Sequence, residues 1–208
     1  FDALVKGARG EDLATIIYTS GTTGEPKGAM LTHGNLASTL NLSTDPFGFT
    51  EKDSCISFLP LSHVTARHLD YAMMCNKATV AYCPKFDLLP QAMKALQPTI
   101  FVAVPRVYEK VFATVKATAA ESSRAKRRIA TSAFAVGEKK VRGGTGPLLA
   151  LQAALADKLV LGKVRARMGG RLRYAVSGGA PLAPEIAEFF AACGVTILEG
   201  YGMTECTT

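Results

Sequence analysis

The chain has 208 residues, of which 48% are hydrophobic and 20% are charged, and its formal net charge is +7. This mixture is typical of a globular protein and excludes the disordered and fibrous classes. No apolar run reaches the length that crosses a bilayer. The first residue is Phe1 rather than Met, and the last residues have no tail character. We therefore expect a piece of a longer polypeptide.

The positive charge gathers in three segments, at 124–128, 139–142 and 163–173. Aromatic residues do not interleave with these charges, so we predict solvated helix faces, or a surface covered by missing chain, rather than a nucleic-acid site. Peripheral contact with the inner face of a membrane stays open. The five cysteines are scattered and lack CxxC spacing, which favours reduced thiols and a cytoplasmic location. His63 and His68 lack the spacing of a zinc-binding HExxH helix.

Short apolar runs predict strands at 13–19, 55–59, 78–83, 100–104, 172–177 and 195–198. Longer helical patterns lie near 33–43, 62–76, 88–97, 105–119, 122–141, 148–168 and 184–193. Pro105 and Pro184 suit first helical turns, and Gly194 suits a helix end. This alternation predicts an α/β fold in which helices layer a mostly parallel sheet, with a helical excursion at about 106–168.

The segment 18–28 reads YTSGTTGEPKG and follows the first predicted strand. Its glycines let successive N–H groups converge on an anion, its hydroxyls add donors and Lys27 adds a charge. The segment fails the Walker pattern, because Pro26 stands where the second glycine belongs and Gly28 follows the lysine. An anion-binding loop is favoured over a P-loop NTPase, and the alternative is a polar turn between a strand and a helix.

Three further motifs follow predicted strands. EGYGMTE at 199–205 has Glu205 where a dinucleotide fingerprint has its third glycine. A carboxylate beside a phosphate loop suits Mg²⁺, and the ring of Tyr201 suits stacking on a base. SGGAPL at 177–182 and the His63 segment, FLPLSHVTAR, each also fit a purely structural turn. Ligands gather at the carboxyl ends of parallel strands, so the shared placement of these motifs with YTSGTTGEPKG predicts a site.

Together these four motifs resemble those of the adenylate-forming superfamily of acyl-CoA synthetases, luciferases and peptide-synthetase adenylation domains. The flanking segments at 30–36, 101–111 and 169–182 are similar to the long-chain fatty acid–CoA ligase branch. The resemblance implies that residues 1–208 form part of the large N-terminal, ATP- and acyl-binding domain of an AMP-dependent ligase, without its C-terminal domain. It implies ATP- and Mg²⁺-dependent activation of a long-chain fatty acid to acyl-AMP, then thioester formation with coenzyme A. Without the lysine of the C-terminal domain, we expect little activity from this piece alone.

The resemblance also implies a role for individual residues. Lys27, Thr204 and Glu205 would act in catalysis, and Thr19 and Glu205 would hold Mg²⁺. His63 and Gly178 would line the acyl pocket. ATP would be held by two groups of residues, of which the first surrounds the phosphates: Thr19, Ser20, Gly21, Thr22, Thr23, Gly24 and Lys27. The second would frame the adenine and reach the α-phosphate: Gly178, Gly179, Ala180, Glu199, Gly200, Tyr201, Gly202 and Thr204.

One position departs from the pattern of some relatives, which place a tryptophan gate four residues after the position of His63. Arg67 stands there and the chain has no tryptophan, so the acyl length stays open. We expect a fatty acid, ATP and coenzyme A as partners, and no nucleic acid. Two alternative functions stay open. One is a ligase that loads its acyl-adenylate onto a carrier protein or another acceptor, and the other is a non-catalytic nucleotide-binding domain.

Overall fold

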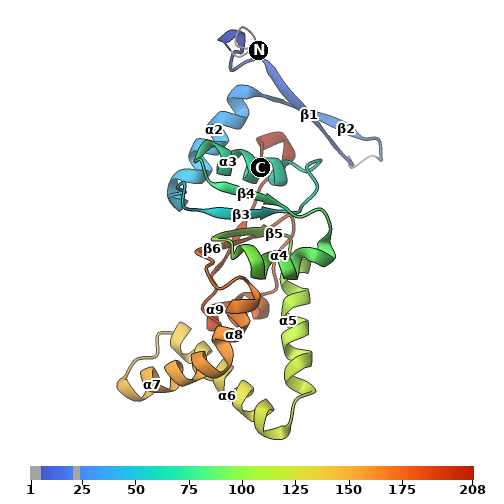
Figure 1. The fold of residues 1–208 in the computed structure, drawn as a ribbon. Coiled ribbons are helices and arrows are strands. Elements are labelled where there is room, and N and C mark those ends of the chain that lie inside the picture. Colours follow the sequence, from blue (N-terminus) through green and yellow to red (C-terminus); the bar gives the residue numbers. More distant parts are fainter. Residues whose placement is uncertain (1–5, 21–23) are drawn as a thin grey trace. The chain divides into compact units, whose positions relative to one another are not determined.

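The computed structural model describes residues 6–20 and 24–208, which belong to two compact units (Figure 1). The first unit comprises Phe1–Tyr82 and Tyr201–Thr208, and the second comprises Cys83–Gly200. Three residues of the predicted phosphate loop, Gly21, Thr22 and Thr23, lie outside the described residues.

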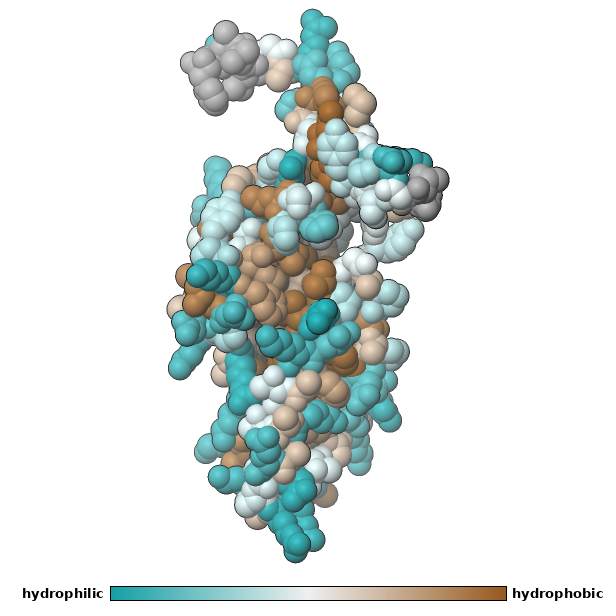
Figure 2. All heavy atoms as spheres, turned by 90° about the vertical axis from the view of Figure 1, so that its right-hand side faces the viewer, coloured by the Kyte–Doolittle hydropathy of each residue, from teal (hydrophilic) through white to brown (hydrophobic). Residues whose placement is uncertain are grey.

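The first unit opens with an antiparallel hairpin of β1 (Leu13–Thr19) and β2 (Lys27–Thr32). Ile17 and Leu31 are the buried side chains of this hairpin, and they pack with Val64. Other apolar side chains of the hairpin are exposed, and they form the brown stripe along it in Figure 2. The remaining elements are α2 (His33–Thr44), the 3-10 turn η1 (Asp45–Phe47), β3 (Ser54–Ser57), α3 (Val64–Cys75), β4 (Thr79–Tyr82) and the 3-10 turn η4 (Thr204–Cys206). β3 and β4 pair in parallel.

Strand β2 was not predicted, and the interpretation of 18–28 as a turn between a strand and a helix is wrong. The segment instead joins two antiparallel strands, and helix α2 begins only at His33. Thr32 ends β2 and caps α2, because its Oγ1 accepts a hydrogen bond from the Asn35 N–H at 3.2 Å. The Asn35 side chain returns the contact by accepting from the Thr32 N–H at 3.0 Å. This reciprocal capping fixes where the strand ends and the helix starts.

In the second unit three strands pair in parallel: β5 (Ile100–Ala103), β6 (Tyr174–Gly178) and β7 (Ile197–Gly200). The helical elements are the 3-10 turn η2 (Phe86–Leu88), α4 (Leu89–Leu96), α5 (Pro105–Ala120), α6 (Arg124–Val141), α7 (Pro147–Ala156), the π-helical turn η3 (Asp157–Leu161), α8 (Gly162–Arg167) and α9 (Pro184–Ala192). Pro105 and Pro184 begin helices as predicted, and Gly194 follows α9 with φ +79°. Parallel strands alternating with helices confirm the α/β class.

Tyr108 on α5 forms the centre of the core of the second unit. Its side chain is fully buried, and its ring makes edge contacts with Phe101 on β5 and Phe190 on α9, at centroid distances of 6.0 and 5.7 Å. Its hydroxyl donates to the carbonyl of Val176 on β6 at 2.9 Å. Burial raises the pKa of this hydroxyl, so it stays a donor. One side chain thus ties two helices to the parallel strands.

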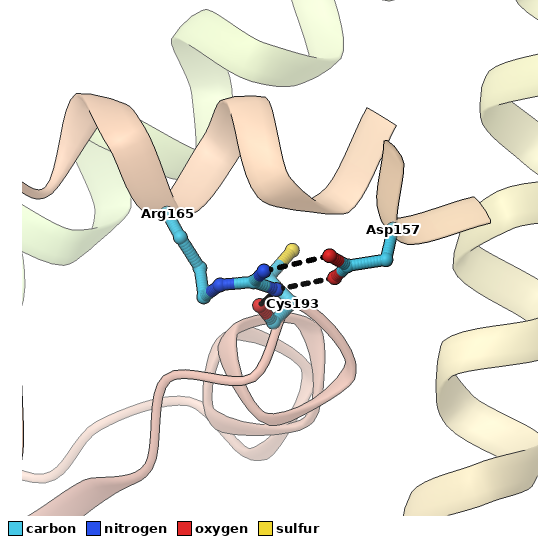
Figure 3. A network of polar contacts seen from close by, with 3 residues as sticks. All are labelled: Asp157, Arg165 and Cys193. Atoms are coloured by element: carbon cyan, nitrogen blue, oxygen red, sulfur yellow. Dashed lines mark hydrogen bonds and ion pairs between the residues drawn. The ribbon is translucent and has the colours of Figure 1, made fainter. Parts of the chain in front are cut away.

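The helical excursion predicted at about 106–168 is confirmed, as α5 to α8 contain no strand. The single helix expected near 148–168 is interrupted by the π-helical turn η3. Figure 3 shows how this turn is held: Arg165 on α8 donates from Nη1 and Nη2 to the carboxylate of Asp157, at 2.6 and 2.8 Å. Arg165 Nη1 also donates to the carbonyl of Cys193, just after α9, at 2.9 Å. The guanidinium therefore joins η3, α8 and the end of α9.

The cysteines behave as the sequence indicates. Cys55, Cys83 and Cys193 are buried, and all five thiols are free. Burial raises the pKa of Cys55 and of Cys193 to about 12, so both stay protonated and unreactive at neutral pH. Within the described residues, no helix combines the length and apolarity that crossing a membrane requires.

The Asp157–Arg165 contact generates a prediction about stability. Hydrogen bonding to Arg165 lowers the pKa of Asp157, so the contact stabilises the fold above the ordinary carboxyl pKa. The pair is partly exposed, so we expect Asp157→Asn to lower the free energy of unfolding by about 1 kcal/mol at pH 7. The deficit should shrink as the pH falls below about 4, where the native carboxylate takes up its proton. Urea unfolding at several pH values measures both effects.

Glu188→Gln is the matched control, since it removes a more exposed contact to Arg142 of 3.4 Å. It should change the free energy of unfolding by less than about 0.5 kcal/mol. Equal losses in the two variants, or a deficit for Asp157→Asn that does not depend on pH, would contradict the stabilising role of the Arg165 contact.

Candidate nucleotide and acyl site

Thr19 and Lys27 face each other at the open end of the β1–β2 hairpin. They are register partners, and Thr19 Oγ1 donates to the carbonyl of Lys27 at 3.4 Å. Thr19 is half-buried, whereas Ser20, Gly24 and Lys27 are exposed. Among the described residues Lys27 makes no ion pair, so its charge is not neutralised there. The hydroxyl of Thr19 therefore precedes the segment that joins the strands, and the ammonium group of Lys27 follows it.

Two glycines shape this segment. Gly24 has φ +86°, a conformation that residues with side chains rarely adopt, and a Cβ at this position would meet no described atom within 4 Å outside its chain neighbours. Gly28 lies opposite Tyr18, and a Cβ at Gly28 would come within 2.9 Å of Ile16 Cγ2. The glycine at this position thus permits the close approach of the two strands.

The turn η4, which carries Thr204 and Glu205, contacts strand β2 within the first unit. The next residue, Thr207, is buried, and its hydroxyl is hydrogen-bonded to that of Thr39 on α2. It also donates to the carbonyl of Asn35 at 3.5 Å. Segments far apart in the sequence therefore meet: the strand that begins at Lys27 lies beside the turn that holds the candidate metal ligand.

The donor set fits a magnesium ion that is shared with phosphates. Glu205 is exposed and makes no ion pair with the described residues, so its carboxylate is available. In the part of the chain that the structure describes, His, Cys, Asp and Glu form no group of three or more that could cage an ion. A single carboxylate with hydroxyl and phosphate oxygens is a coordination that Mg²⁺ accepts.

A second group of candidate residues lies at the carboxyl ends of β6 and β7 in the second unit. Gly178 pairs with Gly200, and Ser177 pairs with Glu199. Gly179 has φ +82°, which turns the chain away from the strand toward α9. Glu199 Oε2 accepts a hydrogen bond from the N–H of Leu182 at 3.1 Å. The carboxylate thereby fastens the SGGAPL loop to the end of the neighbouring strand.

Ser177, near the end of β6, was not predicted as a site residue. It is buried, and its Oγ has no hydrogen-bond partner among the described residues. A buried hydroxyl without a partner is uncommon and marks a position where a ligand or water is expected. The signal in the sequence is a polar residue that ends an apolar strand directly before a pair of glycines.

His63 precedes α3 as its N-cap residue and is exposed. Its side chain makes no capping hydrogen bond, although its backbone N–H donates to the carbonyl of Pro60 at 3.0 Å. Arg67, one turn further on, donates to the carbonyl of Leu61 and to the hydroxyl of Thr15 on β1. The residue at the position of the tryptophan gate thus joins α3 to the hairpin.

The predicted site residues divide between the two units. Thr19, Ser20, Gly24, Lys27, His63, Tyr201, Gly202, Thr204 and Glu205 belong to the first, and Gly178, Gly179, Ala180, Glu199 and Gly200 belong to the second. Tyr201 and Gly202 are exposed, as is Ala180. Each unit therefore carries its own set of candidates: hydroxyl, ammonium and carboxylate groups in the first, and glycine-rich strand ends in the second.

Residues 3–208 match the family described as AMP-binding enzyme. The chain is 40% identical over 207 residues to the long-chain-fatty-acid–CoA ligase FadD15 of Mycobacterium bovis, covering 98% of this chain and 34% of that protein. It is 37% identical to the human long-chain-fatty-acid–CoA ligase 1, covering 95% of this chain and 28% of that protein. The chain thus spans about a third of the length of these curated relatives.

Among solved structures, the chain is similar to ATP-bound MatB from Rhodopseudomonas palustris, with a TM-score of 0.63 and 28% identity. That match covers 95% of this chain and 30% of MatB. The family match extends over nearly every residue, and it includes the hairpin, the SGGAPL loop and the turn at Glu205. The chain therefore belongs to the AMP-binding enzymes, the adenylate-forming superfamily.

Proposed function

We propose that this chain forms the central part of the N-terminal domain of an AMP-forming long-chain fatty acid–CoA ligase. The observation that supports this most directly is the contact between β2, which begins at Lys27, and the turn that carries Thr204 and Glu205. It brings a cation and a free carboxylate into one unit, as a site for metal-bound triphosphate requires. The similarity to long-chain ligases supports the choice of substrate.

In the proposed reaction, the fatty acid carboxylate attacks the α-phosphorus of ATP. An acyl oxygen–phosphorus bond forms, the bond from that phosphorus to the bridging oxygen breaks, and pyrophosphate leaves with the electron pair. Both reactants are anions, so the site has to supply positive charge and alignment more than acid–base groups. Lys27 and the N–H groups around Gly24 hold the pyrophosphate end, and Thr204 holds the α-phosphate.

Thr19 and Glu205 would hold Mg²⁺, which would supply positive charge to the phosphates and to the leaving pyrophosphate. Gly179, Gly200 and Tyr201 frame the adenine, while His63 and Gly178 line the entry of the acyl carboxylate. Coenzyme A then attacks the acyl carbon through its thiolate, and AMP leaves. The thioester step needs the polypeptide beyond this chain, so the full-length protein is the enzyme to assay.

Exchange of pyrophosphate into ATP by the full-length protein tests the proposal. Exchange should require palmitate and Mg²⁺, and coenzyme A should then yield a thioester. No exchange with any carboxylic acid would leave a non-catalytic nucleotide-binding domain. Exchange followed by transfer of the acyl group to a carrier protein, with no transfer to coenzyme A, would identify a ligase that loads its acyl-adenylate onto a carrier protein.

Charge at the hairpin generates a specific prediction. We expect Lys27→Ala and Glu205→Ala each to lower the rate of adenylation by about 100-fold or more, the scale for losing one preorganised charge-stabilising group. Initial rates of pyrophosphate exchange at saturating ATP measure the effect. Lys52→Ala and Glu51→Ala are matched controls, because both residues are exposed in the same unit. Near-normal rates in the Lys27 or Glu205 variant would show that the triphosphate binds elsewhere.

The hydrogen bond from the Leu182 N–H to Glu199 leads to a prediction about the KM for ATP. Glu199→Ala removes the acceptor that fastens the SGGAPL loop, and we expect the KM for ATP to rise about 10-fold. Glu199→Gln keeps an acceptor oxygen at the same place, so its KM should stay within about 3-fold of the wild-type value. If both variants lose affinity equally, the charge of Glu199 acts on the nucleotide directly and the positioning role is wrong.

A further inference from the structure

A cavity of about 770 Å³ lies within the second unit, apart from every residue assigned above. Helices α4, α5 and α8 surround it, together with the turn at Gly169–Gly170. Its volume falls in the range that holds small organic ligands. None of the candidate nucleotide or acyl residues lines it.

The floor of the cavity is apolar and well packed. The lining side chains Leu89, Met93, Phe101, Val107 and Met168 are all buried. Such a surface favours a hydrocarbon chain, because each buried methylene contributes about 0.8 kcal/mol.

The shape of this floor depends on a tight turn. Gly169 has φ +89°, and a Cβ there would lie 3.0 Å from the carbonyl oxygen of Met93 and 3.0 Å from Pro98 Cδ. Only glycine allows the turn before β6 to approach the end of α4 so closely. The close approach of this backbone turn to the end of α4 therefore fixes one wall of the cavity.

The rim of the cavity is basic. Four exposed cations line it, Lys94, Lys110, Lys163 and Arg167, against a single carboxylate, Asp87. Lys110 Nζ lies 4.9 Å from the centre of the Phe86 ring, which holds it at the mouth. The other three make no ion pair with any described residue. Four cations against one carboxylate leave the rim with a net positive charge.

The cavity also faces away from the candidate nucleotide residues of the same unit. Gln97 and the Gly169–Gly170 turn precede β5 and β6, so they mark the amino ends of these strands. Gly178 and Gly200 stand at the carboxyl ends of β6 and β7. Five residues of extended strand separate the two edges of β6 by about 13 Å. A ligand in the cavity would therefore not occupy the adenine position.

From these observations we propose that the cavity is a second binding site, for an amphiphile that carries one acyl chain and an anionic head group. The chain lies on the apolar floor, and the head group meets Lys163, Arg167 and Lys94 at the rim. This site does not depend on the proposed ligase reaction, because it shares no residue with it. Carboxylate and phosphate head groups both suit the rim.

Direct binding to the full-length protein tests the proposal, with probes of equal chain length below their micelle concentrations. Dodecanoate and dodecyl phosphate should bind in calorimetry in the presence of Mg²⁺ and a saturating α,β-methylene analogue of ATP, with which no acyl-adenylate can form, and their relative affinities identify the preferred head group. Dodecanol and dodecyltrimethylammonium should bind at least about 10-fold more weakly, because they lack the anionic charge. Equal binding of all four probes would overturn the assignment of an anion site.

Substitutions at the cavity test whether the probes bind there. Lys163→Glu with Arg167→Glu should weaken dodecyl phosphate binding about 10-fold or more by reversing the charge of the rim. Ala166→Trp should block the cavity from an exposed position, without disturbing the core. The double variant Lys116→Glu with Lys139→Glu is the control, because both lysines are exposed on helices of the same unit and neither lines the cavity.

Binding in the cavity and the proposed adenylation reaction can be tested separately. The cavity variants should leave palmitate-dependent pyrophosphate exchange within about 2-fold of the wild-type rate, and Lys27→Ala should leave dodecyl phosphate binding unchanged. Unchanged binding in both cavity variants would overturn the second site, whatever the outcome of the exchange assay.

Discussion

The hydrogen-bonded register of the β1–β2 hairpin is the constraint on which the first unit depends. It sets Thr19 opposite Lys27, and it starts β2 at the residue whose charge the proposed chemistry needs. Strand β2 then leads without a gap into α2, whose Asn35 and Thr39 bind Thr207. The turn at Thr204–Glu205 is thereby held against the same strand. Two motifs far apart in the sequence, the hairpin and the Thr204–Glu205 turn, therefore belong to one unit through β2 and α2.

In the second unit the main chain is accessible at the carboxyl ends of β6 and β7. Tyr108 and its aromatic neighbours bind the helices to the strands, and this packing leaves the carboxyl ends of β6 and β7 side by side. Glycines at Gly178, Gly179 and Gly200 keep these ends free of side chains, so a flat ligand can approach the main chain. Glu199 then fixes the loop that follows β6.

Much of this fold could be predicted from the sequence, because strongly apolar strands and proline-started helices carry local signals. The six predicted strands are present, and Pro105 and Pro184 begin helices. Strand β2 could not be predicted, since KGAMLT contains lysine, glycine and alanine, which are depleted in strands, and it becomes a strand through pairing with β1. The π-helical turn η3 likewise depends on the distant carbonyl of Cys193. The residue types of the site followed from the motifs, whereas the contact of β2 with the Glu205 turn required the structure.

In the proposed reaction the fatty acid carboxylate attacks the α-phosphorus of ATP while Lys27 and Glu205 hold the triphosphate. The most direct measurement uses palmitate labelled with heavy oxygen in its carboxylate, the full-length protein, ATP and coenzyme A, and detects the label in the products by mass spectrometry. We predict one labelled oxygen in AMP and none in pyrophosphate. Label in inorganic phosphate, or thioester formed with unlabelled AMP, would contradict attack at the α-phosphorus.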